Sequence, residues 1–493
     1  MPAPRTLPEA LRLAFALEGQ GRTGEAAQVL QGIVQAHPGH AGALEALGRL
    51  HLGAGDYAAA AAWLRRAVDA GASGPGLKAQ LGSALLAQGE AEEALLLFES
   101  SLARAPRGEV HAQACAALRM LHRYDEARAH LDEALRLAPS SADALLEEAD
   151  LARDLGRADE AFAAVEAAHF RHPKDPFVLD RYALALLGRG RWQKGWELYE
   201  GRKAHPAHPL HPRPGQPPAW DGSLTPGLRL LVVAEQGVGD VLQFLRFPRR
   251  LAAAGLKVRV EFPPEQFGLA PLLAVQGDGV TYGFDGRVPP PIHAMEALMS
   301  LPHRLGLADE AGLASGPYLR AEEARRSAWR ERLGPKRSRL RAGLVWAGNR
   351  AYPFDAQRSL PPEALAPLLA REDVEWVSLQ TDLGRFGRAP GVPEGRWHDA
   401  GPRLHDYAET AALLSTLDLL VSVDTGVAHL AGALGLPVLL LLSFQGDWRW
   451  MEGREDSPWY PGHRLLRQAR PGAWEGVVAR AAAELDGMPG RAG

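Results

Sequence analysis

One short loop of the chain combines the two glycines and the carboxylate that a substrate-binding turn needs. An apolar run at 228–234 has the length and branching of a buried parallel strand. The loop that follows it directly consists of Glu235, Gln236, Gly237, Val238, Gly239 and Asp240. Glycine lets the backbone approach a ligand closely, and we expect a helix to begin near Val241. Asp240 has two alternative roles: it caps that helix, or it is a general base toward an acceptor hydroxyl, with Glu235 as its rival.

A second loop has the composition of an anion-binding helix start. We expect a strand over 419–424, and the residues at its end are Asp424, Thr425, Gly426, Val427, Ala428 and His429. A helix of small residues follows, so its first amides and the positive end of its dipole would face a ligand. Such a terminus suits a diphosphate, to which Thr425 would add a hydroxyl. For His429, one turn inside the helix, a core or capping role is an equal alternative.

Arginines follow a third apolar run, at 341–348. Asn349 and Arg350 come directly after this run, and Arg358 lies eight residues beyond Arg350. A guanidinium group is permanently charged and forked, which suits it to phosphate oxygens. A solvated loop arginine is the commoner case, but two arginines beyond a buried strand favour a phosphate clamp here.

Aromatic residues gather in the loop region 447–460. This region begins with Asp447, Trp448, Arg449 and Trp450, which we expect to contact the substrate. Exposed tryptophans near a cleft suit stacking on a sugar or a base. A hydrophobic lid, or a contact with the repeats described below, is an equally good interpretation.

No metal or other cofactor is expected. The chain contains no Asp-x-Asp motif of the kind that holds a metal-chelated nucleotide. The histidines at 205, 208 and 211 invite a metal interpretation, but neither a cysteine nor a carboxylate cluster completes the site. Proline recurs throughout 205–218, which therefore is predicted to be a semi-rigid spacer within a linker over 204–227.

The three chemical loops must be positioned by an α/β framework. Short apolar runs predict strands at 228–234, 257–262, 341–348, 375–380, 419–424 and 437–443. A polar helical stretch around 321–340 separates the first two runs from the others. The pattern predicts two Rossmann-like, doubly wound lobes, an N-terminal one over 228–325 and a C-terminal one over 340–485. Ligands of such sheets bind beyond the carboxyl ends of the strands, where all three loops lie.

The first two fifths of the chain consist of internal repeats. Turn positions recur about every 34 residues, at Gly21, Gly55, Gly89, His122, Gly156 and Gly190. Small residues precede each turn by seven positions, at Ala14, Gly48, Gly82, Cys115, Ala149 and Ala183. Small side chains let two helices pack closely, and this period resembles the tetratricopeptide repeat (TPR). We predict six repeats over 7–203, an α-solenoid whose concave face binds a peptide or protein segment. Dimerisation, or support of the neighbouring domain, is the alternative role.

Composition excludes several classes of protein. The 493 residues include 55 basic and 59 acidic ones, a balance that does not favour broad binding of nucleic acid or of an anionic membrane. The longest apolar run, 436–442, is far too short to span a bilayer. The N-terminus has no secretory pattern, and the single cysteine, Cys115, fits a reducing compartment and a buried structural thiol. We therefore expect a soluble, cytoplasmic protein.

The motifs together resemble the bacterial tetratricopeptide-repeat glycosyltransferases, in which a repeat array precedes a GT-B pair of lobes. The resemblance spans most of 10–470 and rests on the stretches 195–200, 220–222, 234–240, 343–349, 358–359, 422–429 and 447–450. The catalytic half is also similar to the lipopolysaccharide heptosyltransferases. That similarity implies that Asp240 is the base and that Asp424, Thr425, Gly426 and His429 hold the donor diphosphate. It also implies a basic phosphate ligand, for which Arg358 is the nearest match and Arg350 the alternative.

Heptosyltransferases lack the repeats, so heptose and a lipid acceptor do not carry over. The resemblance instead implies transfer of a sugar from a nucleotide sugar to a hydroxyl of a protein or peptide recruited by the repeats. A flagellin-type acceptor is one hypothesis, and a homo-oligomer through the repeats is another. Two alternatives stay open: a non-enzymatic adaptor with a degenerate GT-B domain, and a nucleotide-sugar isomerase of the same fold. A nucleoside monophosphate carrier is equally compatible with the sequence.

Overall fold

The computed structural model divides into two compact units, Met1–Pro173 and Lys174–Gly493. It describes residues 6–205, 208–211, 215–287, 291–350, 355–382 and 395–490. We call Met1–Pro173 the repeat unit and Lys174–Gly493 the α/β unit. The boundary lies one helix pair earlier than predicted, because the sixth repeat packs with the α/β unit rather than with the other five.

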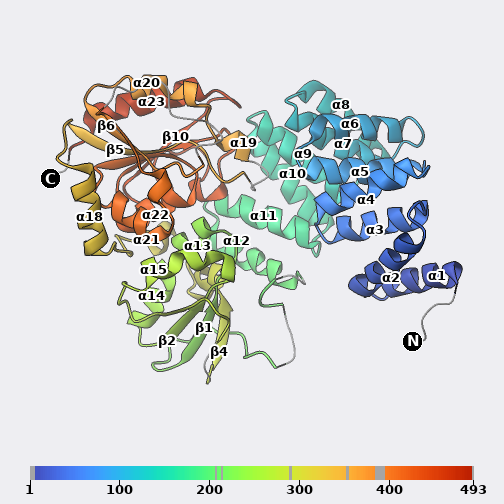
Figure 1. The fold of residues 1–493 in the computed structure, drawn as a ribbon, viewed down its shortest axis with the longest axis horizontal. Coiled ribbons are helices and arrows are strands. Elements are labelled where there is room, and N and C mark those ends of the chain that lie inside the picture. The colour runs from blue at the N-terminus through green and yellow to red at the C-terminus, as the bar shows by residue number, and fades with distance from the viewer. Residues whose placement is uncertain are drawn as a thin grey trace. The chain divides into compact units, whose positions relative to one another are not determined.

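The repeat unit is a stack of five helix pairs (Figure 1). Its helices are α1 (Leu7–Gly19), α2 (Thr23–Ala36), α3 (Ala41–Gly53), α4 (Tyr57–Asp69), α5 (Pro75–Ala87), α6 (Ala91–Leu102), α7 (Gly108–Met120), α8 (Tyr124–Leu137), α9 (Ala142–Asp154) and α10 (Ala158–Arg171). The turn residues have positive φ, for example 71° at Gly21, which explains the recurring glycine. His122, the exception to glycine, also has a positive φ of 57°.

Small residues occupy the positions where paired helices meet, as predicted. A Cβ atom added to Gly82 would lie 2.6 Å from Cε1 of Phe98, so no larger residue fits there without rearrangement. Cys115 is fully buried at the equivalent position of its repeat, and burial raises the pKa of its thiol to about 12. The thiol is therefore protonated at neutral pH and structural, as the sequence indicates.

The α/β unit contains two sheets, and every strand pair in them is parallel. The first sheet has the order β3-β2-β1-β4, and its strands are β1 (Arg229–Val233), β2 (Lys257–Glu261), β3 (Thr281–Gly283) and β4 (Ala294–Ala297). The second has the order β10-β9-β8-β5-β6-β7, with β5 (Leu340–Val345), β6 (Val374–Ser378), β7 (Trp397–Asp399), β8 (Leu419–Val423), β9 (Val438–Leu442) and β10 (His463–Arg467). All six predicted strands are present.

Helices connect and cover these strands (Figure 1). They are α13 (Val238–Phe244), α14 (Arg246–Ala253), α15 (Ala270–Leu273), α16 (Leu301–Arg304), α17 (Glu310–Leu313), α18 (Glu323–Leu333), α19 (Asp355–Arg358), α20 (Ala366–Leu369), α21 (Tyr407–Leu414), α22 (Gly426–Leu434) and α23 (Trp474–Gly487). Helices α13 and α22 follow β1 and β8, the strands that precede the two predicted loops. Among the described residues, no helix combines the length and apolar character needed to cross a membrane.

The sixth helix pair, α11 (Pro176–Gly188) and α12 (Trp192–Tyr199), shares the hydrophobic core of the α/β unit. Trp196 is buried, with its ring centre 6.2 Å from that of Phe244 and 5.7 Å from that of Trp448. Large aromatic rings bury far more apolar surface than the small residues that join the other repeats, which explains why this pair belongs to the α/β unit.

The linker is anchored where it follows α12, contrary to the prediction of a spacer. His208 is buried, and its Nε2 lies 2.5 Å from a carboxylate oxygen of Glu235. Its other ring nitrogen accepts a hydrogen bond from the amide of Leu210. This histidine is thus a docking residue for the linker.

Candidate functional site

The two glycine loops predicted to carry the chemistry lie against each other in the structure. Helices α13 and α22 begin at these loops, and a Cβ atom added to Gly239 would lie 3.5 Å from Cα of Gly426. The same atom would lie 3.1 Å from Cδ2 of His429. A side chain at 239 would therefore press on His429, and the two loops singled out from the sequence lie side by side.

Asp240 lies at the start of α13 with both carboxylate oxygens bonded. Its Oδ2 accepts a hydrogen bond from the amide of Gly237 at 2.9 Å, which confirms the capping role. Its Oδ1 accepts a hydrogen bond from Nη2 of Arg449. Burial raises the pKa of Asp240, Arg449 opposes this shift, and nearby Asp447 adds to it. The carboxylate is thus held in a charged cluster at the point where the loops meet.

Glu235 has a structural position instead of the base role considered from the sequence. Nη2 of Arg202 donates to its Oε1 at 2.5 Å, and the amide of Met299 donates to the same oxygen at 3.2 Å. His208 and Nε of Arg202 contact its Oε2. Although burial alone would raise the pKa of Glu235, these partners lower it to about 2. A carboxylate so weakly basic and so fully bonded is unsuited to accept a substrate proton, which corrects the prediction of a rival base.

The rest of the first loop supports this arrangement. Gln236 has a positive φ of 65°, which is strained for a residue with a side chain, and its carbonyl accepts a hydrogen bond from Nε2 of Gln266 at 2.9 Å. Gly237 supplies the amide that Asp240 caps. The loop is therefore held by one hydrogen bond within it and by one from Gln266.

The second loop places a carboxylate and a neutral imidazole at the start of α22. Burial and the neighbouring Asp447 raise the pKa of Asp424 to about 6. Nε2 of His429 lies 4.0 Å from Oδ1 of Asp424, and Nδ1 of His429 lies 3.1 Å from the hydroxyl of Tyr460. Burial lowers the pKa of His429 well below its usual range, so the ring is neutral at pH 7. The hydroxyl of Thr425 lies 3.3 Å from that of Ser422.

Arg358 rather than Arg350 reaches this loop. Nη1 of Arg358 donates to the backbone carbonyl of Asp424 at 3.0 Å, and its Nε donates to Asp355 at 3.1 Å. Arg350 instead lies 3.1 Å from a carboxylate oxygen of Asp382, and its side chain is 55% exposed. Asn349 is exposed in the loop after β5. The structure thus brings one of the two predicted arginines to the Asp424–His429 loop.

The aromatic loop is buried, contrary to the expected exposed stacking platform. Trp450, Trp459 and Tyr460 are fully buried, and half-buried Trp448 packs on Trp196 of α12. The contact with the repeats, one of the two predicted alternatives, is therefore present. Packing demands these aromatics because they fill the space between the sixth repeat and the sheets.

Arg449 is the member of this loop that reaches the site. Its guanidinium donates to Asp240, to Oδ1 of Asp447 at 2.8 Å, and to Oε1 of Gln243 at 2.9 Å. Its Cζ also lies 4.4 Å from the ring centre of Trp448. The sequence placed Arg449 among the substrate contacts but held no signal that it pairs with Asp240.

Arg467 is a residue near the site that sequence reasoning missed. It ends β10, and its Nη2 donates to the carbonyls of Met451 at 2.7 Å and Trp450 at 3.3 Å. Burial lowers its pKa, whereas the nearby carboxylates of Glu452 and Asp424 raise it. A prediction of β10 would have revealed it, because the end of a strand is where ligand-binding residues lie.

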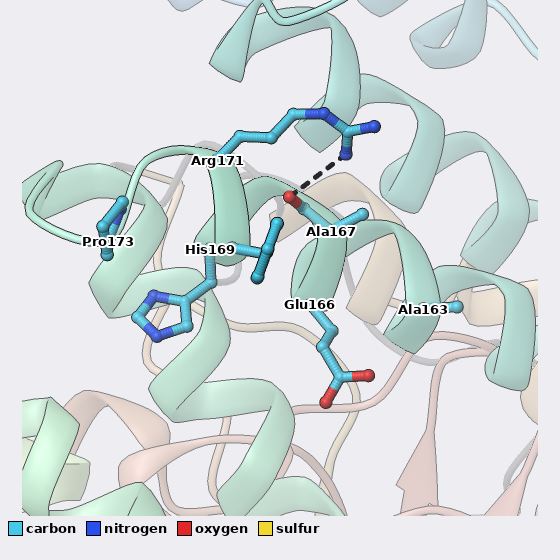
Figure 2. A pocket seen from close by; sticks show the side chains of 7 residues that line it. Ala163, Glu166, Ala167, His169, Arg171 and Pro173 are labelled. Atoms are coloured by element: carbon cyan, nitrogen blue, oxygen red, sulfur yellow. Dashed lines mark hydrogen bonds between the residues drawn. The ribbon is translucent and has the colours of Figure 1, made fainter.

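A hollow of about 710 Å³ lies elsewhere, on the repeat unit (Figure 2). Six of its lining residues belong to α10 and the seventh is Pro173, the last residue of the repeat unit. They are Ala163, Glu166, Ala167, His169, Phe170, Arg171 and Pro173. Figure 2 shows the guanidinium of Arg171 directed at the carbonyl of Ala167, to which it donates at 3.3 Å. No residue of the two chemical loops contributes to it. Within the described ranges, no three histidine, cysteine or carboxylate side chains are grouped to hold a metal.

Two family matches fall on the two parts of the chain. Residues 11–75 and 111–176 match the family described as Tetratricopeptide repeat. Residues 404–443 match Glycosyltransferase family 9 (heptosyltransferase), and this stretch contains β8, α22 and β9 with the Asp424–His429 loop.

Individual proteins are also similar to parts of this chain. Protein FlbA of Caulobacter vibrioides is 30% identical over 386 residues, which are 72% of this chain and 63% of FlbA. The chain thus spans less than two thirds of that relative. Among solved structures, TTC0263, a thermophilic TPR protein of Thermus thermophilus, is 28% identical over 36% of this chain and 98% of its own, with a TM-score of 0.32. YrrB, a TPR protein with an unusual peptide-binding site, is 18% identical over 35% of this chain and 89% of its own, with a TM-score of 0.30. This chain thus contains tetratricopeptide repeats and, in its C-terminal part, a stretch that is similar to glycosyltransferase family 9.

Proposed function

We propose that the protein is a glycosyltransferase of GT-B type, which moves a sugar from a nucleotide sugar to a hydroxyl of an acceptor protein without a metal ion. The observation that carries the proposal is the junction of the two glycine loops. There Gly239, the neighbour of Asp240, meets Gly426 at the start of α22. Arg358 and His429 both lie near Asp424, just before that helix start.

The C-terminal lobe would hold the donor diphosphate. Helix α22 has nine residues and begins at Gly426, directly after its N-cap residue Thr425, so its first amides have no partner within the helix. The helix dipole and the Arg358 guanidinium both favour a dianion at this place. Neutral His429 would add a hydrogen-bond donor, because a neutral imidazole can donate from one ring nitrogen.

Asp240 would act as the general base. It would take the proton of the acceptor hydroxyl while the oxygen forms a bond to the anomeric carbon of the sugar. The bond between that carbon and the diphosphate oxygen breaks, and the leaving diphosphate keeps the electron pair. Arg358 and the α22 amides would stabilise the charge that develops on it.

The repeats would supply the acceptor. The concave face of α1–α10 is the kind of surface that binds extended protein segments, which favours a protein or peptide over a small molecule. A flagellin-type acceptor stays a hypothesis from resemblance. Its test is the mass of flagellin in a flagellated host after deletion of the gene, and an unchanged mass would remove that acceptor.

Donor binding is tested by thermal unfolding against a panel of nucleotides and nucleotide sugars at about 1 mM. A ligand with a Kd near 10 μM stabilises the folded state by about 2.7 kcal/mol, because it binds that state alone. For a unit of some 320 residues this corresponds to a rise in Tm of about 4 °C. A shift selective for one nucleotide identifies the donor class. No shift with any member favours the adaptor, and an isomerised nucleotide sugar as the product favours the isomerase.

Donor affinity should fall as the pH rises through the pKa of Asp424. This carboxyl has a pKa of about 6 and stands at the proposed diphosphate site, so its ionisation adds a repelling charge. We expect affinity for the selected nucleotide sugar to drop about 10-fold between pH 5 and pH 8. A nucleotide sugar is the suitable probe because its diphosphate diester does not titrate in that range.

The matched variant for this pH dependence is Asp424→Asn. Measured by calorimetry, it should bind equally at both pH values, and near the affinity of the wild type at pH 5. A variant that keeps the full pH dependence would assign the effect to another group and place the diphosphate away from Asp424.

A further inference from the structure

We infer that Arg449 is a positioning residue that exchanges partners during the reaction: it pairs with Asp240 in the structure and transfers to the donor diphosphate when the donor binds. This inference rests on the proposed function, because it needs a diphosphate at the start of α22. It adds a coupling between donor binding and the release of the base, which the proposed function does not contain.

The first step is that Asp240 is a weaker base while it keeps its present partner. The Arg449 guanidinium donates to Oδ1, and the Gly237 amide donates to Oδ2. A positive charge in direct contact favours the ionised carboxylate and weakens its affinity for a proton. Removing that charge would let the burial of Asp240 raise its pKa further, toward the range that suits a general base.

The second step is that Arg449 lies within electrostatic reach of the proposed diphosphate site. Its partner Asp240 follows Gly239, which meets Gly426 at the start of α22. The ring of Trp450, the next residue after Arg449, stacks on the ring of His429 with the centres 5.1 Å apart. Arg449 is 8% exposed, and its guanidinium group makes three hydrogen bonds within the described part of the chain, although a guanidinium carries five N–H donors. Forked donors of this kind bind phosphate oxygens in pairs.

The third step is that the backbone under Arg449 is fixed, so that only its side chain needs to move. Nε1 of Trp459 donates to the Arg449 carbonyl at 3.1 Å, and the Trp450 amide donates to the Asp447 carbonyl at 3.0 Å. Neighbouring Trp448 packs on α12, with its ring 5.7 Å from that of Trp196. The sixth repeat therefore holds the loop from which the guanidinium reaches either partner.

A double-mutant cycle tests the exchange. ADP, GDP, CDP and UDP are titrated by calorimetry at pH 8 into the full-length wild type, and the tightest binder is carried through Asp240→Asn, Arg449→Gln and the double variant. Arg449→Gln should weaken binding by about 10- to 100-fold, as expected for lost charge-assisted hydrogen bonds. Asp240→Asn should tighten binding about 5-fold, because Arg449 no longer has to leave a carboxylate. In the Arg449→Gln background the same change should tighten it less than about 2-fold.

Each outcome decides between the two proposals. Equal effects of Asp240→Asn in both backgrounds would mean that only the long-range charge matters, and they would overturn the exchange. Wild-type affinity in Arg449→Gln would overturn it as well, while leaving the diphosphate site intact. If none of the four nucleotides binds the wild type, the proposed diphosphate site at the start of α22 fails, and the exchange fails with it. If thermal unfolding shows that Arg449→Gln does not fold, Arg449→Lys takes its place, because it keeps the charge without the forked donors. This variant should show a loss of nucleotide affinity between that of the wild type and that expected for Arg449→Gln. Wild-type affinity in Arg449→Lys, or an effect of Asp240→Asn in its background equal to that in the wild type, overturns the exchange.

Discussion

Asp240→Asn should reduce sugar transfer by about 10³-fold while the protein still binds the nucleotide. The asparagine keeps the shape of the side chain and an oxygen that can accept from the Gly237 amide, but it cannot take a proton. General-base catalysis contributes about 10²- to 10⁴-fold to a rate, which sets the expected loss. Turnover is measured as transfer of labelled sugar from the nucleotide sugar selected by thermal unfolding to proteins of a cell extract.

Two further variants sharpen this prediction. Asp285→Asn makes the same chemical change at an exposed carboxylate in the loop after β3, a strand of the sheet that contains β1, and should retain full activity. Asp240→Glu keeps a carboxylate and should retain more activity than the asparagine variant. Parallel losses of nucleotide binding and turnover in Asp240→Asn would assign the residue to binding or folding instead of proton transfer.

The elements could be predicted where hydrophobicity alone determines them. Strand β9 is an uninterrupted apolar run, β8 is apolar except for Ser422, and all residues of both strands are buried. The strands that were missed lack this signal. Strand β3 has only three residues, and β10 begins and ends with His463 and Arg467, whose polar side chains obscure the run. The edge position of β3, β7 and β10 in their sheets explains why their sequences need not be apolar throughout.

The site could be predicted only as far as single loops reveal it. Both glycine loops were found because they follow buried strands, and the structure brings them together at Gly239 and Gly426. The pairing of Asp240 with Arg449 joins residues that are 209 positions apart, and no local pattern encodes such a contact. The same holds for Glu235, because its partners lie in a helix end and a proline-rich linker that were interpreted as separate from the lobe.

The domain boundary illustrates a conflict between periodicity and packing. The sixth repeat keeps the spacing of the others, with Gly190 at its turn and a positive φ of 72°. Its helices nevertheless carry Trp192 and Trp196, which are buried in the core of the α/β unit. A repeat pattern therefore identifies the local structure of α11 and α12, whereas the large aromatic side chains determine which core they join. The sixth repeat therefore belongs to the α/β unit, which also contains Arg449.

Glu235→Gln should destabilise the α/β unit by about 3–5 kcal/mol, because it leaves Arg202, whose side chain is only 8% exposed, without its main anionic partner. The measurement is urea unfolding at pH 7, with Glu363→Gln at an exposed position as the matched control, which should change stability by less than about 0.5 kcal/mol.

The pH dependence of this loss of stability identifies its cause. Since the folded-state pKa of Glu235 is about 2, below its ordinary value of 4.5, its stabilisation is complete above pH 4.5 and is lost as the pH falls toward 2. The difference in free energy of unfolding between the wild type and Glu235→Gln should therefore shrink by about 2 kcal/mol between pH 7 and pH 3. A difference that stays constant over this range would mean that packing, and not the charge of Glu235, holds the loop that presents Asp240.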